Sequence, residues 1–267
     1  MHPLLTTLEW HGVVRPIGSY GALLALALLT GSALALRAGA RAGWDLGALI
    51  AALAGAVAAG FVGAYLLSVA VLWPQLGSLA ASLARPGIVF YGALIGGAAG
   101  LYGSARGFGL APLATLDLML PALPVGHAIG RIGCLLGGCC YGAPTELPWA
   151  IHYASVVVGP GPQQLAERAG RHPWPLYEAG LLLLLAAVFW APRRFAGWPG
   201  RRAACYVALY ALGRMWLEPL RGDRVRGLLW GGGFSTSQLI SLLLLSAAGA
   251  LVYVVSRRER RHPRAAS

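Results

Sequence analysis

Four polar residues in the last quarter of the chain recur at the spacing of a helical turn. The stretch YALGRMWLEPLRGD (210–223) places, at intervals of four, four and three, the residues Tyr210, Arg214, Glu218 and Arg221. On a helix such residues lie on one face. Ionisable groups inside an apolar segment are costly unless paired, and mark candidate functional sites. Two arginines against one carboxylate suit an anionic partner such as a phosphate. The alternative is a structural ion-pair ladder that only holds helices together.

A second candidate group lies at the end of a long apolar run, in PVGHAIGRIG (124–133). His127 and Arg131 are four residues apart, so they share one helical face. The neighbouring glycines Gly126, Gly130 and Gly133 leave space beside Arg131 for a close ligand or a neighbouring helix.

A third group, RHPWPLYEAG (171–180), leads directly into another apolar run. Its two prolines suit the entry to a helix, which places Tyr177 and Glu178 near the first turn. Glu178 there either complements the positive end of the helix dipole or takes part in chemistry. His172 alone is weak support for a site.

Three of the four cysteines lie within seven residues, as Cys134, Cys139 and Cys140 in GRIGCLLGGCC. A zinc site would need paired ligands, typically two CxxC elements, which this spacing does not supply. A disulfide between Cys134 and one of the other two is feasible in an oxidising compartment. Otherwise the three cysteines act as small apolar packing residues.

The composition predicts the elements that position these residues. The chain is 57% hydrophobic and 11% charged, with mean hydropathy +0.65, whereas soluble proteins carry about 25% charged residues. We therefore expect one all-α integral membrane domain over 1–267, with a small outward-facing cap at 137–175 between the fourth and fifth helices. The apolar runs long enough to cross a bilayer predict seven spans, at about 16–36, 47–73, 87–105, 112–135, 176–191, 203–220 and 234–256.

The formal charge of +12 comes from arginine, since the chain has 21 arginines and no lysine. No nucleic-acid-binding motif accompanies them, so anionic lipid headgroups are the expected partner and nucleic acid is not. Arginines concentrate at 193–202 and in the tail at 257–264. The positive-inside rule then predicts an outside N-terminus and a cytoplasmic C-terminus.

Taken in order, the motifs resemble those of the bacterial prolipoprotein diacylglyceryl transferases, seven-span enzymes of the inner membrane. The matching elements are Tyr20–Gly21, FYGALIGG (90–97), Asp117, GRIG (130–133), RHPWPLYEA (171–179), YALGRMWLEPLR (210–221) and STSQLIS (235–241). This chain departs from the family pattern at Tyr91, where the family has histidine. It also departs at Cys134, Gly137 and Cys139, which replace Asn, Asn and Glu.

The resemblance implies transfer of a diacylglyceryl group from phosphatidylglycerol to the lipobox cysteine of a preprolipoprotein, without metal or organic cofactor. It implies catalytic roles for Arg131, Arg214, Glu218, Tyr210, Tyr91 and His127. It implies lipid contacts by Arg131, Arg214, Arg221, Tyr20, Gly130, Gly133, His172, Tyr177 and Glu178. The base is left open among Tyr91, His127 and His172. Alternatives are a changed acceptor, thiol-dependent chemistry on the cysteines, or a non-enzymatic lipid binder or transporter.

Overall fold

The chain is helical through most of the part that the computed structural model describes. That part comprises residues 4–10, 13–84, 89–153, 156–158, 161–163, 169–190, 198–222, 228–229 and 234–261. The chain divides into two compact units, Ser32–Met119 and the combination of Met1–Gly31 with Leu120–Ser267. The expected all-α class is confirmed, whereas a single domain over 1–267 stays a prediction.

The smaller unit is a set of helices with clear start and stop signals. It contains the second half of α1 (Ser19–Arg41), then α2 (Leu46–Leu76), α3 (Leu79–Ala84), α4 (Phe90–Gly107) and α5 (Pro112–Met119). Helix α2 begins where Asp45 Oδ1 accepts hydrogen bonds from the backbone N–H groups of Gly47 and Ala48, at 2.8 and 3.2 Å. It ends at Gly77, whose φ of 63° is the left-handed conformation that glycine adopts without strain.

Helices α2 and α4 pack through small residues. Gly63 of α2 faces Gly92 and Gly96 of α4 so closely that a Cβ atom on any of the three would overlap the facing backbone. Close approach of this kind maximises van der Waals contact between helices in lipid. The small residues of α4 therefore allow it to pack closely against α2.

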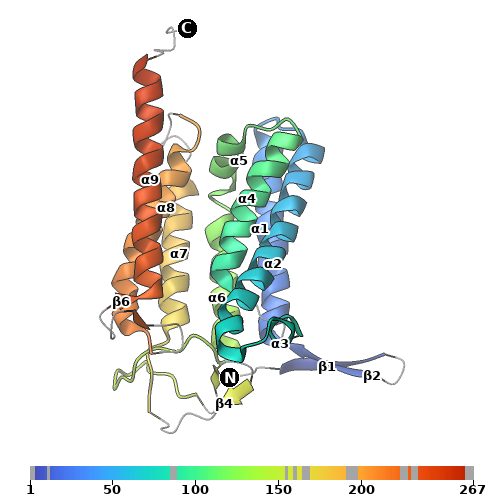
Figure 1. The fold of residues 1–267 in the computed structure, drawn as a ribbon, viewed down its shortest axis with the longest axis vertical. Coiled ribbons are helices and arrows are strands. Elements are labelled where there is room, and N and C mark those ends of the chain that lie inside the picture. The colour runs from blue at the N-terminus through green and yellow to red at the C-terminus, as the bar shows by residue number, and fades with distance from the viewer. Residues whose placement is uncertain are drawn as a thin grey trace. The chain divides into compact units, whose positions relative to one another are not determined.

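The larger unit holds the helices that carry the buried ion pairs described below. It contains the first half of α1, α6 (Leu123–Leu136), α7 (Trp174–Trp190), α8 (Arg201–Leu217), the 3₁₀ helix η2 (Glu218–Leu220) and α9 (Thr236–Arg261). Helices α7, α8 and α9 lie side by side, and α6 packs on α7 (Figure 1). Leu185 and Phe189 of α7 pack against Tyr206 of α8 in the apolar core.

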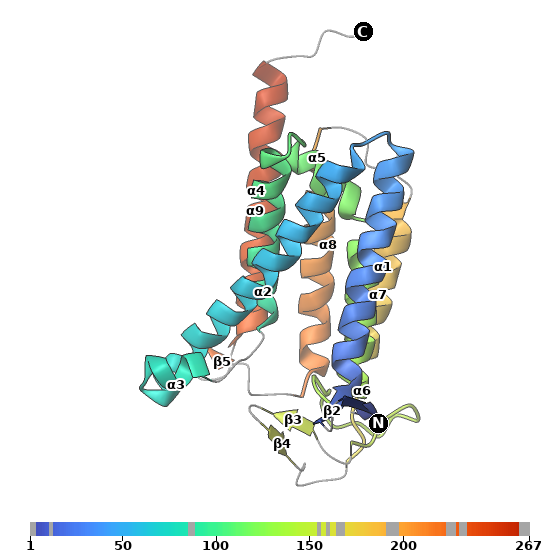
Figure 2. The ribbon, with the colours of Figure 1, turned by 90° about the vertical axis from the view of Figure 1, so that its right-hand side faces the viewer.

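The described part of this unit also holds short antiparallel hairpins, one before α1 and the others between helices, and the sequence did not predict them. They are β1 (Leu4–Trp10) with β2 (Val13–Gly18), β3 (Val156–Val158) with β4 (Gly161–Gln163), and β5 (Leu228–Leu229) with β6 (Phe234–Ser235). The second hairpin lies within the segment expected to form the cap (Figure 2). Each hairpin is separate from the others, so the class stays all-α.

The expected continuous span at 112–135 is wrong in one respect. The chain forms α5 and α6 with a turn at residues 120–122 between them. Pro121 lies in that turn, and Pro124 occupies the first turn of α6. Proline removes a backbone donor and restricts the residue before it, so two prolines three residues apart interrupt the helix.

Several helices suit a bilayer by length and composition. Among the described residues, Ser19–Arg41 and Leu46–Ala70 are each long and apolar enough to cross a membrane, and the broken pair α5–α6 would make a third span. Trp174–Trp190 and Ser237–Tyr253 are apolar but shorter. Large apolar side chains on these helices are exposed, as at Leu29 and Leu184, which suits contact with lipid. The protein is a membrane protein, and the count of seven spans stays a prediction.

Candidate functional site

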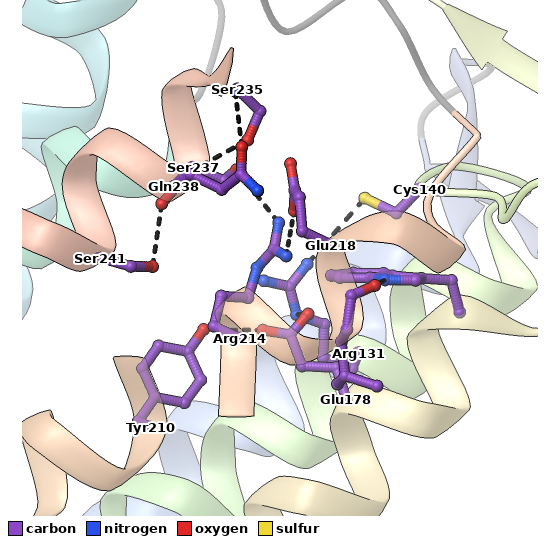
Figure 3. A network of polar contacts seen from close by, with 12 residues as sticks. Arg131, Cys140, Glu178, Tyr210, Arg214, Glu218, Ser235, Ser237, Gln238 and Ser241 are labelled. Atoms are coloured by element: carbon purple, nitrogen blue, oxygen red, sulfur yellow. Dashed lines mark hydrogen bonds and ion pairs between the residues drawn. The ribbon is translucent and has the colours of Figure 1, made fainter. Parts of the chain in front are cut away.

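A buried carboxylate joins three helices of the larger unit. Glu178 of α7 is fully buried, and its Oε2 lies 2.9 Å from Nε of Arg131 on α6. Its other oxygen accepts a hydrogen bond of 2.7 Å from the hydroxyl of Tyr210 on α8. Figure 3 shows the three side chains converging from their separate helices. Each carboxylate oxygen therefore has a partner, which a charge removed from water requires.

His127 joins this group from one turn earlier on α6. Its Nε2 lies 4.0 Å from Oε1 of Glu178, and its ring centroid lies 5.8 Å from that of Tyr210. The spacing of four between His127 and Arg131 had predicted that they share a helical face. The structure confirms this and adds that the shared face points at Glu178.

A second ion pair lies at the end of α8. Arg214 Nη1 donates to Oε2 of Glu218, one turn later, and Arg214 Nη2 donates to Ser237 Oγ on α9 at 3.1 Å. Ser235 and Gln238, which flank Ser237 at the start of α9, form two reciprocal hydrogen bonds (Figure 3). Ser235 N donates to Gln238 Oε1 at 2.9 Å, and Gln238 N donates to Ser235 Oγ at 3.1 Å. This capping box holds the first turn of the helix that presents Ser237 to Arg214.

Trp174 connects the two ion pairs, a role that its sequence motif did not indicate. Its indole is fully buried, and Nε1 donates a 3.0 Å hydrogen bond to the carbonyl oxygen of Leu217 at the end of α8. Three guanidinium carbons lie within 5.5 Å of the indole centroid, those of Arg131, Arg214 and Arg221. Each such cation–π contact contributes about 0.5 to 2 kcal/mol. The available signal was a tryptophan at the helix entry of the RHPWPLYE motif.

The predicted four-residue ladder on one helical face is only partly correct. Tyr210 and Arg214 lie within α8, but the α-helix ends at Leu217 and continues as the 3₁₀ helix of Glu218–Leu220. Proline at 219 cannot donate the backbone hydrogen bond of an α-helix, so the last turn tightens. Arg221 is extended, with φ −87° and ψ 136°, and reaches the site through Trp174.

The sequence model of a family described as prolipoprotein diacylglyceryl transferase matches residues 11–254. The chain belongs to the prolipoprotein diacylglyceryl transferase family. A Clostridium perfringens protein named phosphatidylglycerol–prolipoprotein diacylglyceryl transferase 2 is 31% identical, over 92% of this chain and 93% of that protein. Proteins named phosphatidylglycerol–prolipoprotein diacylglyceryl transferase from Clostridium tetani and Gloeobacter violaceus are 38% and 37% identical, over 64% and 66% of this chain. The chain spans 65% and 63% of those two relatives.

The transferase-family motif at 171–178 also anchors the segment that follows α6. Tyr177 Oη accepts a 2.8 Å hydrogen bond from Trp149 Nε1, and it lies 3.1 Å from His172 Nδ1. The backbone of His172 bonds to Gly142 and Ala143. His172 and Tyr177 therefore contact the cap segment, and Tyr177 also packs against the apolar cluster that contains Trp174. Their predicted contact with lipid stays a prediction.

Two glycines hold the backbones of this region together. A Cβ atom on Gly142 would overlap the backbone of His172, and one on Gly222 would overlap the backbone of Gly142. Gly142 N donates to the carbonyl of His172, and Gly222 N donates to that of Tyr141, both at 3.1 Å. Direct backbone contacts thus join three segments, namely the chain after α6, the residues that enter α7 and the residues that follow η2.

The other predicted positions have mixed outcomes. Gly133 packs on α1, since a Cβ there would lie 3.2 Å from Leu23 Cβ and 3.5 Å from Tyr20 Cδ2, whereas a Cβ on Gly130 would meet nothing within 4 Å. The glycines thus serve both expected purposes, helix packing and open space. Tyr91 lies in α4 of the smaller unit, and its side chain is outside the described residues. The roles assigned to Tyr91 and Tyr20 stay predictions.

None of the three clustered cysteines, all within the described part of the chain, forms a disulfide. Cys140 Sγ lies 4.0 Å from Nη1 of Arg131, and Cys139 Sγ lies 3.4 Å from the carbonyl oxygen of Cys134. Hydrogen bonding to Cys134 and Cys140, together with burial, raises the pKa of the Cys139 thiol above its ordinary range. The predicted disulfide stays a prediction.

Proposed function

We propose that this protein transfers the diacylglyceryl group of phosphatidylglycerol to the lipobox cysteine thiol of preprolipoproteins. The observation that carries the proposal is the arrangement of Arg131, Arg214 and Arg221 around the buried indole of Trp174. These three cations outnumber the two carboxylates beside them, Glu178 and Glu218, so the five groups sum to +1 (3 − 2). A phosphodiester headgroup supplies the complementary negative charge. The names of the relatives support the same two substrates.

In the proposed reaction, the thiol sulfur attacks the carbon of the diacylglyceryl group that is bonded to the phosphate oxygen. A carbon–sulfur bond forms, the bond between that carbon and the phosphate oxygen breaks, and glycerol phosphate leaves. The thiol proton goes to a base and then to the leaving phosphate or to water. Arg131 and Arg214 stabilise the charge that accumulates on the leaving phosphate, because guanidinium groups held in place by Glu178 and Glu218 need no reorganisation.

The base in this proposal is His127. Of the three candidates named from the sequence, His127 lies 4.0 Å from the carboxylate of Glu178, one turn from Arg131. His172 is engaged with Tyr177 at the cap segment. The carboxylate of Glu178 opposes the repulsion that Arg131 exerts on an imidazolium at His127.

The proposed location is the bacterial inner membrane, as a multi-pass protein with the N-terminus outside and the C-terminus in the cytoplasm. The arginines at 193–202 and 257–264 support this orientation through the positive-inside rule. The cap segment at 137–175 then faces the periplasm, on the side where a secreted preprolipoprotein presents its lipobox.

The test is complementation of a bacterium depleted of its own diacylglyceryl transferase, with lipidation of a reporter lipoprotein as the readout. We expect the wild-type chain to restore maturation, and Arg131→Ala and Arg214→Ala to fail at equal expression. Arg41→Ala, at the exposed end of α1, is the matched control and should complement fully. Wild-type failure in cells, combined with no transfer to a lipobox peptide by purified protein in phosphatidylglycerol vesicles, would refute the proposal.

A further inference from the structure

Three thiols converge at the C-terminal end of α6. The sulfur atoms of Cys134, Cys139 and Cys140 all lie within 4.8 Å of one another. Cys134 and Cys140 are buried, and Cys139 is partly buried. Cys134 and Cys140 pack against Trp174, the residue on which the three arginines of the site stack. The proposed transfer reaction uses none of these sulfurs.

The backbone turns in a way that brings consecutive cysteines to one point. Side chains of adjacent residues in extended chain point in opposite directions. Cys140 has φ 58°, and it is the one non-glycine residue with a positive φ in the described part of the chain. This left-handed conformation is disfavoured for residues with a Cβ atom. It reverses the chain, so the side chain of Cys140 returns toward those of Cys134 and Cys139.

The convergence of three sulfurs matches metal coordination better than a disulfide, which joins two and leaves one aside. Around a metal with metal–sulfur bonds of about 2.3 Å, three sulfurs in a triangle are about 4.0 Å apart, since the side is √3 times the bond. From separations of at most 4.8 Å, the sulfurs must approach by under about 1 Å. Rotation of the cysteine side chains covers that distance.

We propose that Cys134, Cys139 and Cys140 form a three-thiolate binding site for a monovalent copper ion. Thiolates select soft ions, among them Cu(I) and zinc. A structural zinc site takes four protein ligands. Within the described part of the chain, this site offers three, the cysteines themselves. Binding releases three thiol protons and forms three copper–sulfur bonds, with no change in oxidation state. The product carries a charge of −2, which the neighbouring Arg131 partly balances.

Copper at this site would act on the transferase chemistry, a consequence that rests on the proposed function. Cys140 Sγ lies 4.0 Å from Nη1 of Arg131, so an anionic copper–thiolate group competes with the lipid phosphate for that guanidinium. We therefore expect Cu(I) to inhibit diacylglyceryl transfer.

The first experiment measures binding on the purified full-length chain in detergent, fully reduced and without oxygen. Cu(I) is titrated in competition with a colorimetric Cu(I) chelator, and the copper neighbours are identified by X-ray absorption. We expect one copper per chain with three sulfur neighbours. Cys134→Ser and Cys139→Ser should weaken binding at least tenfold. Cys205→Ser, which removes the one cysteine outside the cluster, is the matched control and should bind as the wild type does.

Cys140→Gly is the variant least expected to disturb folding, because glycine adopts a φ of 58° without strain. The substitution removes one of the three sulfur atoms. Equal copper binding by the wild type and by a variant lacking all three clustered cysteines would overturn the proposal. So would zinc bound more tightly than Cu(I) in the same competition. Transfer activity is compared with and without copper within each protein. A chain that binds copper but transfers no lipid even when copper is absent refutes the proposed function and leaves the metal site standing.

Discussion

Arg131 and Glu178 form a buried ion pair between α6 and α7, with 2.9 Å between Nε and Oε2. The second oxygen of the same carboxylate is held by Tyr210 of α8 at 2.7 Å. One carboxylate thus fixes the guanidinium group proposed to bind the lipid phosphate, and it also links three helices. Structural and functional losses at this point have to be separated by experiment.

Removing one partner of the pair should destabilise the protein strongly. Glu178→Gln removes the negative charge that balances Arg131 in the interior, and breaking a buried ion pair in this way costs about 3 to 5 kcal/mol. We expect a large drop in the thermal unfolding midpoint in detergent, together with loss of transfer. The double variant Arg131→Met with Glu178→Met removes both charges and should recover much of the unfolding midpoint while staying inactive. Recovery of activity in the double variant would contradict the role of Arg131 in lipid binding.

Trp174 should matter as a surface for the arginines as well as a packing residue. Trp174→Phe keeps an aromatic face but loses the hydrogen bond to Leu217, and Trp174→Leu loses both. Because three guanidinium groups contact the ring, we expect transfer to fall further in Trp174→Leu, measured as kcat/KM for phosphatidylglycerol. Trp190→Leu, at the other end of α7 with its side chain 56% exposed, is the control and should retain activity. Equal activity in the two Trp174 variants would rule out the cation–π contribution.

We expect Ser237 to position the guanidinium group of Arg214 and to contribute little to the stability of the fold. Its hydroxyl accepts a bond from Arg214 Nη2 at 3.1 Å, and hydrogen bonds to charged groups contribute about 1.5 to 3 kcal/mol. Ser237→Ala should therefore lower kcat/KM about tenfold or more. The matched control is Ser241→Ala, one turn later, whose hydroxyl donates to the backbone carbonyl oxygen of Ser237. A similar loss in both variants would indicate a general disturbance of α9.

His127 should behave as the proton acceptor in transfer. His127→Gln keeps a polar side chain of similar size but has no basic nitrogen, so we expect a lower kcat with a nearly unchanged KM for phosphatidylglycerol. Raising the pH, which increases the thiolate fraction of the acceptor, should restore part of the rate. The comparison is His172→Gln, which alters the contact with Tyr177 and should not show this rescue. Rescue in the His172 variant alone would reassign the base.

The local parts of the site followed from spacing, whereas the pairing between helices did not. His127 with Arg131, and Arg214 with Glu218, are neighbours because residues four apart on a helix are adjacent. The contact between Arg131 and Glu178 joins positions 47 residues apart (178 − 131), and only the packing of α6 on α7 determines it. Periodicity carries no information of that kind.

Two errors in the predicted helices have a common cause. Hydropathy continues through the prolines at 121 and 219, so the apolar runs looked uninterrupted. The backbone cannot follow, because proline offers no N–H group to the helix. The role of Trp174 was missed for a different reason, since an aromatic residue at a helix entry is usually part of the core.

The meeting of three segments at Gly142 and Gly222 has a consequence for how this protein can vary. The contacts at this junction are between backbone atoms, so substitutions of side chains cannot change its geometry gradually. Any residue larger than glycine at either position must displace a neighbouring backbone. In a saturation-mutagenesis library these codons should tolerate glycine alone, while the codon for Gly130, which faces open space, accepts alanine. The evolutionary freedom of this region then lies in the side chains around the junction.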